Sequence, residues 1–188
     1  FQIRNPVLGT NVKGAAHYQI KRPDSFRVEI VTDKDHSIFV SDGSFLTIYK
    51  PGRREYAQLK ASDSILATMF KAIGILTLHA RMIEFFWTVD YLANVDEDVI
   101  VNNVGADTVN GEACQNFAVK RFEEEWNVWI RKDGAPRICR LVSRTTDQGA
   151  FTVQTNDFKW SDPVDLEPSL FNFNAPENVR EVPISKLQ

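Results

Sequence analysis

The sequence predicts a mainly β fold of the α+β class, an antiparallel sheet with one helical insert. The first observation behind this prediction is a period of two in the apolar residues. In the run "SFRVEI", Phe26, Val28 and Ile30 alternate with Arg27 and Glu29. Such alternation is typical of a strand with one face buried and the other in water.

Turn dipeptides supply the second observation. Asp42-Gly43, Asn110-Gly111 and Asp133-Gly134 each stand between apolar or alternating runs, and Pro51-Gly52 adds a fourth turn. Glycine adopts the positive φ of tight turns without steric cost, and Asn and Asp tolerate it better than most residues. Hairpins should therefore join consecutive strands, which predicts an antiparallel meander.

Further runs continue the series. "SIFV" (37–40) and "FLTIY" (45–49) are apolar on both faces, the pattern of central strands that are covered on both sides. Phe171 and Phe173 predict a last short strand, beyond which prolines stop regular pairing. Additional strands are expected over residues 112–121, 125–131, 136–145 and 150–160.

The stretch from Ser62 to about Ala93 breaks this pattern. Ser62 is the expected N-cap, and Asp63 suits the positive first turn of a helix. Gly74 is a point where the stretch bends or divides into two helices. We expect these helices to cover an apolar face of the sheet. The apolar residues at helical spacing are Ile65, Met69, Ile73, Leu76, Met82 or Ile83, Phe86 and Leu92.

Length and charge limit the classes of function. The 188 residues fit one domain, residues 1–188, and no repeat or linker divides them. A net charge of −3 leaves no broad basic surface, so we expect no nucleic-acid partner. The chain begins at Phe1, which predicts that a signal peptide has been removed. The most apolar region, residues 64–93, is interrupted by charges and does not predict a membrane span.

The two cysteines, Cys114 and Cys139, would lie on the first and third of three successive strands. Strands two apart are separated by roughly 9–10 Å, which is too far for a disulfide. We therefore expect free buried thiols.

The sequence contains no recognisable catalytic constellation. The histidines fall on separate predicted elements without metal-ligand spacing, and the acidic run 123–125 reads as a solvated hairpin end. We expect no cofactor, no metal and no catalytic residue. An enzyme would need an acid or a histidine with a shifted pKa inside a cleft, and the candidates are Glu84, Asp90 and His79.

Two hairpin motifs carry a family resemblance. The segments "YQIKRPDSFRVEI" and "IFVSDGSFLTIYKP" resemble the opening strands of the LolA/LolB-like superfamily of periplasmic lipoprotein carriers. The segments "VNGEACQNFAV" and "EEEWNVWIRKDGAPRICRLV" resemble a sub-family of predicted exported proteins of unknown function. The matching positions of the first two segments are Arg22, Pro23, Asp24, Phe26, Arg27, Asp42, Gly43, Leu46, Tyr49 and Pro51.

The resemblance implies an incomplete antiparallel β-barrel, a curved sheet whose concave face is covered by the helical insert at about 62–93. It implies a periplasmic or exported protein of the bacterial envelope that carries acyl chains or another lipid-like ligand, with a lipoprotein among the cargoes and with peripheral membrane contact. The carriers hold their closed state with an arginine of the helical region. Arg81 is the only arginine there in this chain, and its location alone does not match it to that role.

The predicted cavity lining follows from alternation. Trp126, Val128 and Ile130 should face the ligand while Trp129 faces the other side, although a one-residue error in register would exchange the two faces. The strands contribute Phe26, Val28, Ile30, Ile38, Val40, Leu46, Ile48, Trp126, Val128 and Ile130, and the helices contribute Phe70, Ile73 and Phe86.

The alternative function is an envelope structural or signalling module without small-molecule cargo. Such a module would bind another protein through the half-barrel, by its sheet edge or its Pro-rich tail. A core packed solid by its aromatic residues would favour this alternative over a carrier.

Overall fold

The computed structural model describes residues 1–7, 9–73, 99–122, 124–147, 150–161 and 165–187. Its residue contacts divide the chain into two compact units. Unit 1 comprises residues 1–13 and 94–163, and unit 2 comprises residues 14–93 and 164–188. The expectation of a single domain stays a prediction, and each unit is described by itself below.

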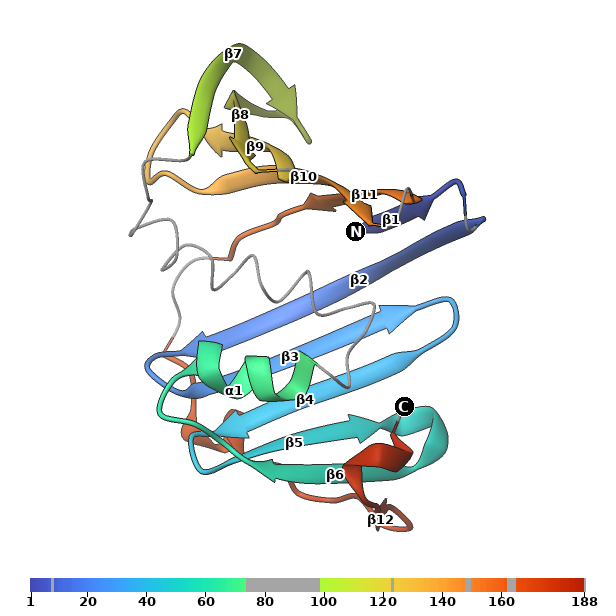
Figure 1. Ribbon diagram of the computed structural model, residues 1–188. Helices are drawn as coiled ribbons and strands as arrows, with labels where there is room; N and C mark the ends of the chain where they lie inside the picture. The colour runs from blue at the N-terminus through green and yellow to red at the C-terminus, as the bar shows by residue number, and fades with distance from the viewer. Residues whose placement is uncertain (8, 74–98, 123, 148–149, 162–164, 188) are drawn as a thin grey trace. The chain divides into compact units, whose positions relative to one another are not determined.

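Unit 1 is an antiparallel sheet in the order β2–β1–β11–β10–β9–β8–β7 (Figure 1). Strands β7 to β11 form the predicted meander. β1 pairs with β11 and with the first four residues of β2, so the two ends of this unit's sequence meet in one sheet. The strands are β1 (Gln2–Asn5), β2 (Thr10–Lys21), β7 (Ile100–Val109), β8 (Glu112–Arg121), β9 (Glu124–Arg131), β10 (Ile138–Asp147) and β11 (Ala150–Asp157).

Unit 2 is a second meander in the order β2–β3–β4–β5–β6–β12 (Figure 1). Residues 14–21 of β2 pair with β3, and the pairs are antiparallel except that β12 runs parallel to β6. The elements are β3 (Ser25–Thr32), β4 (His36–Asp42), β5 (Phe45–Lys50), β6 (Glu55–Lys60), α1 (Ile65–Ile73), β12 (Arg180–Glu181) and the 3-10 turns η1 (Pro51–Arg53), η2 (Pro168–Phe171) and η3 (Ile184–Lys186).

The predicted glycine turns form as expected. Gly43, Gly111 and Gly134 have φ values of 88°, 87° and 78°. Two features exclude a side chain at Gly43. Its φ is positive, and an added Cβ would lie 2.8 Å from the carboxyl carbon of Asp24. Glycine is therefore required where the β4–β5 turn meets the β2–β3 turn.

Both faces of the unit 2 sheet are covered, as the two-sided apolar pattern of β4 and β5 predicts. Cross-strand pairs place Phe26, Phe39 and Ile48 on one face, which we call the helix face. Val40 and Thr47 share the opposite face, which we call the tail face. All five side chains are at most 2% exposed. Burial on both faces is typical of strands in the middle layer of a three-layer arrangement.

The C-terminal tail packs on the tail face. η2 contacts β3 and β4, and its Phe171 is 3% exposed. The ring of Phe173 lies 5.5 Å from Tyr49 and 5.1 Å from Tyr56. The predicted strand at Phe171 and Phe173 is wrong: Phe171 ends the 3-10 turn that Pro168 begins, and the pairing tail residues are Arg180 and Glu181.

α1 is the described part of the helical insert, and Figure 1 shows it in front of β3 and β4. Its Ile65, Met69 and Ala72 are 4%, 1% and 0% exposed, and the Ile65 N–H donates to the Pro23 carbonyl over 3.3 Å. Because the tail occupies the opposite face, α1 is the described element that covers the helix face. The remainder of the predicted insert, residues 74–93, lies outside the described residues.

The predicted N-cap of this helix is off by two residues. The hydroxyl of Ser64 accepts a hydrogen bond from the Ala67 N–H over 3.2 Å, as an N-cap side chain does. Ser62 lies two residues earlier, where its N–H donates to the Thr68 hydroxyl over 2.9 Å. Thr68 is fully buried, so this side chain fixes the approach of the chain to the helix.

The prediction of free thiols is wrong, because Cys114 and Cys139 form a disulfide. Their Cα atoms are 6.8 Å apart, less than two regular strand spacings. The pairing of β10 with β9 shifts register between Ile138 and Arg140, so Cys139 is the extra residue of a β-bulge. Cys114 pairs with Arg131, the last residue of β9. A bulge bends its strand, and here it brings β10 toward β8 where β9 ends.

Candidate functional site

The two faces of the unit 1 sheet differ sharply in charge. Cross-strand pairing aligns Phe117, Val128 and Leu141 on one face. Asn116, Trp129 and Arg140 align on the other face. We call these the uncharged face and the charged face. The prediction that Trp129 faces away from Val128 is confirmed by this register.

By register Arg121, Glu124 and Asp147 belong to the same side as Phe117, at the strand ends. Among the residues of this face whose side chains the structure describes, none carries a charge. The same register places at least one charged residue from each of the seven strands on the opposite side. Those charged-face residues are Arg4, Lys13, Asp107, Glu112, Lys120, Glu125, Arg131, Arg140, Arg144 and Asp157.

The centre of the uncharged face is a strip of apolar side chains on β8, β9 and β10, which we call the apolar strip. Val119 pairs with Trp126 in the row beside Phe117, Val128 and Leu141. Leu141 is 3% exposed, while the other four side chains are half-buried. Partial exposure leaves apolar area that a ligand can still remove from water, at about 25 cal/mol per Å².

Amide side chains border the apolar strip on β11 and β1. Gln154 and Asn156 are 3% and 5% exposed, and the Gln154 amide nitrogen donates to Asn156 Oδ1 over 3.3 Å. On β1, the Asn5 amide nitrogen donates to the Thr152 hydroxyl over 2.9 Å. Buried amides need such partners, so this border is a neutral hydrogen-bonded row next to an apolar one.

Trp129 is anchored on the charged face. It packs against a small cluster formed by Val109 and the disulfide, and its Nε1 donates to Asp107 Oδ2 over 2.9 Å. This hydrogen bond, together with one from the Thr108 N–H and the charge of Arg140, lowers the pKa of Asp107. The Asp157 carboxylate, bonded to Arg140, raises the pKa of that guanidinium.

The predicted lining residues of unit 2 do not share one face. Phe26, Val28, Ile30, Leu46 and Ile48 lie together on the helix face, and each is at most 1% exposed. This part of the predicted lining is packed core.

Ile38 and Val40 lie on the tail face, so their assignment to the same lining is wrong. β4 is buried at five consecutive positions, and the middle three, residues 38–40, are apolar, so alternation does not decide which residues face which side. Of the helical lining residues, Phe70 and Ile73 belong to α1 but their side chains are not described, and Phe86 lies outside the described residues.

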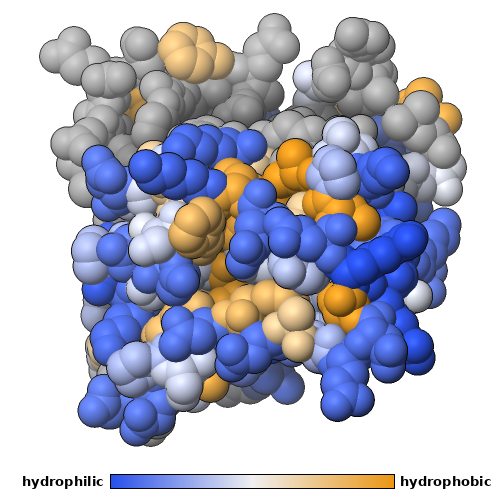
Figure 2. Space-filling view, turned by 90° about the horizontal axis from the view of Figure 1, so that it is seen from below, coloured by the Kyte–Doolittle hydropathy of each residue, from blue (hydrophilic) through white to orange (hydrophobic). Residues whose placement is uncertain are grey.

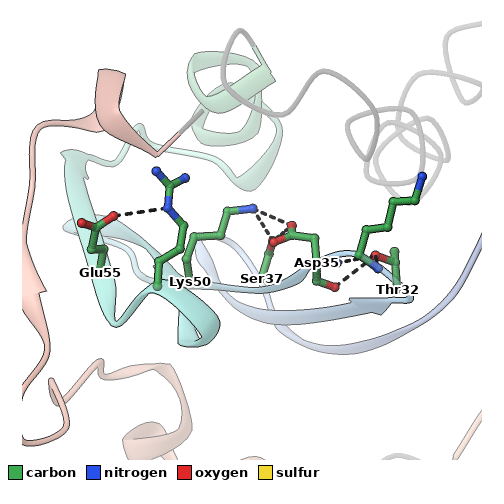
Figure 3. Close-up of polar contacts among 7 residues, drawn as sticks. Thr32, Asp35, Ser37, Lys50 and Glu55 are labelled. Carbon is green, nitrogen blue, oxygen red and sulfur yellow. Dashed lines mark hydrogen bonds and ion pairs between the residues drawn. The ribbon is translucent and has the colours of Figure 1, made fainter.

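A polar cluster contains Ser37, which pairs with Ile30 on the helix face, and Figure 3 shows its contacts. Lys50 Nζ lies 2.6 Å from Asp35 Oδ2 and donates to the Ser37 hydroxyl over 2.7 Å. That hydroxyl donates to the same Asp35 oxygen over 2.6 Å. A serine beside a lysine acts as a nucleophile only if the lysine is neutral. Because Lys50 is paired with a carboxylate, the cluster is an ion pair with a bridging hydroxyl.

The structure adds little to the enzyme candidates. Glu84, Asp90 and His79 lie outside the described residues. His36 Nε2 is 2.7 Å from Glu29 Oε1 in a half-exposed pair, and His17 is exposed. Burial raises the pKa of the Tyr18 phenol, which keeps it protonated. In the part of the chain that the structure describes, no three His, Cys, Asp or Glu side chains cluster as a metal site would require.

The sequence matches the model of a protein family. The model of the family described as "Predicted periplasmic protein (DUF2092)" matches residues 10–185. The chain belongs to this family. The match runs through both units, and the predictions of a periplasmic location and of membership in a group of predicted exported proteins are confirmed by it.

Solved structures give weaker likenesses. The lipoprotein LppX of Mycobacterium tuberculosis aligns with a TM-score of 0.40 at 14% identity, covering 83% of this chain and 87% of LppX. PNGF-II aligns with a TM-score of 0.30 at 11% identity, covering 92% of this chain and 27% of PNGF-II. No curated protein matches the sequence. Neither likeness carries a functional argument. No helix within the described residues has the length and apolar character needed to cross a membrane.

Sequence reasoning missed part of the apolar strip. Phe117 and Val119 alternate with polar neighbours in "ACQNFAVKRF", and this signal was sufficient to place them with Val128. Leu141 was harder to assign, because the bulge at Cys139 changes the phase of β10 relative to the strands beside it.

Proposed function

We propose that this periplasmic protein binds a lipid-like ligand whose acyl portion lies on the uncharged face of unit 1. The observation that carries the proposal is the absence of charge from the apolar strip and its amide border, while each of the seven strands places a charged residue on the opposite face. A solvated sheet face gains nothing from excluding charge, whereas an acyl chain requires it, because an unpaired charge beside hydrocarbon is costly.

The half-buried state of the apolar strip supports the proposal. Phe117, Val119, Trp126 and Val128 retain exposed apolar area, in contrast to the sealed helix face of unit 2. Small-molecule sites are lined mainly by apolar and aromatic side chains with a few polar groups beside them. The strip together with its border of neutral amides has that composition.

Adjacent residues of β9 provide a matched test. Val128 faces the apolar strip, and Asn127 faces away from it, where its Oδ1 accepts from Arg144 over 2.7 Å. Val128→Asp places a carboxylate against the acyl chain and should weaken binding of a fluorescent fatty-acid probe by about tenfold or more. Asn127→Asp introduces the same charge beside an arginine and should leave probe affinity nearly unchanged.

A milder variant separates ligand binding from folding. Val128→Thr keeps the shape of the side chain and replaces one methyl by a hydroxyl, so the sheet should form while probe affinity falls severalfold. Circular dichroism and thermal unfolding would confirm that each variant is folded. Equal probe affinity for all folded variants would overturn the proposal, as would a larger loss in Asn127→Asp than in Val128→Asp.

One observation favours a second candidate, a module that binds another protein by strand addition. β7 is the outer strand of unit 1, and its Ile100, Val101 and Val104 are 58%, 57% and 56% exposed. Exposed apolar edge strands are templates for pairing with another chain. If Val128→Asp leaves probe binding unchanged while Val101→Lys removes concentration-dependent self-association in analytical ultracentrifugation, this second function is the better account.

A further inference from the structure

We propose that the charged face of unit 1 docks on an anionic lipid bilayer through Arg4, Lys13 and Arg144. This inference concerns the face opposite the apolar strip. It goes beyond the proposed ligand binding and does not depend on it.

The three cations lie on β2, β1 and β10, within a patch of four neighbouring strands. Arg4 on β1 and Arg144 on β10 both pair with Val153 of β11, one from each side. Two strand spacings, about 9–10 Å, therefore separate their backbones. Lys13 on β2 pairs with Gln2, two residues from Arg4 on the same face. All three side chains project from one side of a four-strand patch.

Neutral amides hold both guanidinium groups. Asn127 Oδ1 accepts from Arg144 Nη1 over 2.7 Å. The Gln2 amide, oriented with its oxygen toward Arg4, accepts from Nε over 2.7 Å and from Nη2 over 3.0 Å. An amide positions a guanidinium without cancelling its charge. Each arginine also keeps N–H donors in the fork geometry that suits phosphate oxygens.

The remaining charges nearby compensate one another. Arg140 donates to Asp157 over 3.0 Å from Nη2, and Lys120 lies 3.5 Å from Glu125. Glu125 is also the cross-strand partner of Arg144, but its ion pair is with Lys120. Arg4, Lys13 and Arg144 make no ion pair with a described carboxylate. The patch thus concentrates positive charge on a protein whose net charge is −3.

The arrangement fits an extended anionic surface better than a single small anion. The cations come from three strands and spread along a sheet face, instead of converging at one helix end or loop. A periplasmic protein, as this family is described, meets membrane surfaces. Each lysine or arginine near an anionic membrane contributes about 1 kcal/mol of attraction, which corresponds to roughly fivefold in partitioning.

Vesicle co-sedimentation tests the proposal. The full chain should bind vesicles of phosphatidylcholine with phosphatidylglycerol, should not bind phosphatidylcholine alone, and should lose binding as salt rises. The triple variant Arg4→Gln, Lys13→Gln, Arg144→Gln should lower the partition coefficient by about 100-fold. The matched control Lys21→Gln, Lys34→Gln, Lys60→Gln makes the same charge change at exposed positions of unit 2 and should lower it only severalfold.

Three outcomes would overturn the docking surface. Equal losses in the two triple variants would show a net-charge effect without a patch. Equal binding to neutral vesicles would show an apolar mode of attachment. Abolition of binding by millimolar inorganic phosphate at constant ionic strength would show a site for one phosphate group. The fatty-acid probe in vesicle-free solution reports ligand binding separately, so either proposal can fail while the other stands. Thermal unfolding of both triple variants checks that they are folded.

Discussion

The indole Nε1 of Trp129 donates a hydrogen bond to Asp107 across the width of β8, over 2.9 Å. This contact links β9 to β7 and fixes Trp129 on the charged face. Because the register alternates, it also commits Trp126 and Val128 to the uncharged face. The apolar strip and this polar contact on the opposite side of the sheet therefore follow from the same strand register.

The first prediction is a pH titration of that contact. The Trp129 hydrogen bond lowers the pKa of Asp107, so the ionised carboxylate stabilises the native state at neutral pH. A lowered carboxyl pKa means that this contribution is lost as pH falls through the folded value, below the ordinary 3.8. Tryptophan fluorescence should show a transition below that pH. Asp107→Ala should remove it, and a transition that persists unchanged in this variant would refute the assignment.

The second prediction concerns the disulfide. Cys114 and Cys139 are 25 residues apart, and closing a loop of that size stabilises a fold by about 3 kcal/mol. The double variant Cys114→Ser, Cys139→Ser should unfold at lower denaturant concentration by that amount. Thiol titration of the denatured, unreduced protein should find no reactive thiol. Two titrating thiols in protein purified from an oxidising compartment would contradict the pairing.

A third prediction separates packing from charge in the C-terminal tail. Phe171 is 3% exposed against β3 and β4, so Phe171→Ala should cost about 3–4 kcal/mol of unfolding free energy. Arg180 pairs with Glu55 at 2.6 Å, but its side chain is 77% exposed. Arg180→Ala should therefore cost less than about 1 kcal/mol. Chemical denaturation of both variants measures the two costs, and the reverse order would show that the ion pair holds the tail.

Figure 2 views the molecule from the end where β6 and β12 lie in Figure 1. Apolar patches there are separated by hydrophilic residues. The exposed large apolar side chains of unit 2, among those described, are Phe45 and Val31, with exposed fractions of 50% and 44%. β12 also pairs with β6 along this edge. The exposed apolar edge that favours strand addition is that of β7, in unit 1.

Several strands were predictable because an alternating or apolar run stands beside a glycine turn. Asp42-Gly43, Asn110-Gly111 and Asp133-Gly134 mark three hairpins, and the alternating runs between them fix the facing of β3 and β9. Where a strand is apolar on both sides, alternation no longer indicates which residues face which side of the sheet. For this reason Ile38 and Val40 of β4 were assigned to the wrong face.

The remaining differences depend on contacts between distant residues. The bulge at Cys139 has no local sequence signal, yet it decides whether the two cysteines can meet. Ser62 and Ser64 are equivalent N-caps by residue type, and the buried hydroxyl of Thr68 decides between them. The charged-face pair of Arg144 with Asn127 joins β10 to β9 through a register that only the folded sheet defines.

The most direct measurement of the central claim is quenching of tryptophan fluorescence by a brominated fatty acid. Trp126 lies on the uncharged face and Trp129 on the charged face, three residues apart on one strand. Bromine quenches by contact, so an acyl chain on the apolar strip should quench Trp126. Trp126→Phe should remove most of the quenching, and Trp129→Phe should retain it. Retention in Trp126→Phe with loss in Trp129→Phe would place the ligand on the other face and contradict the account.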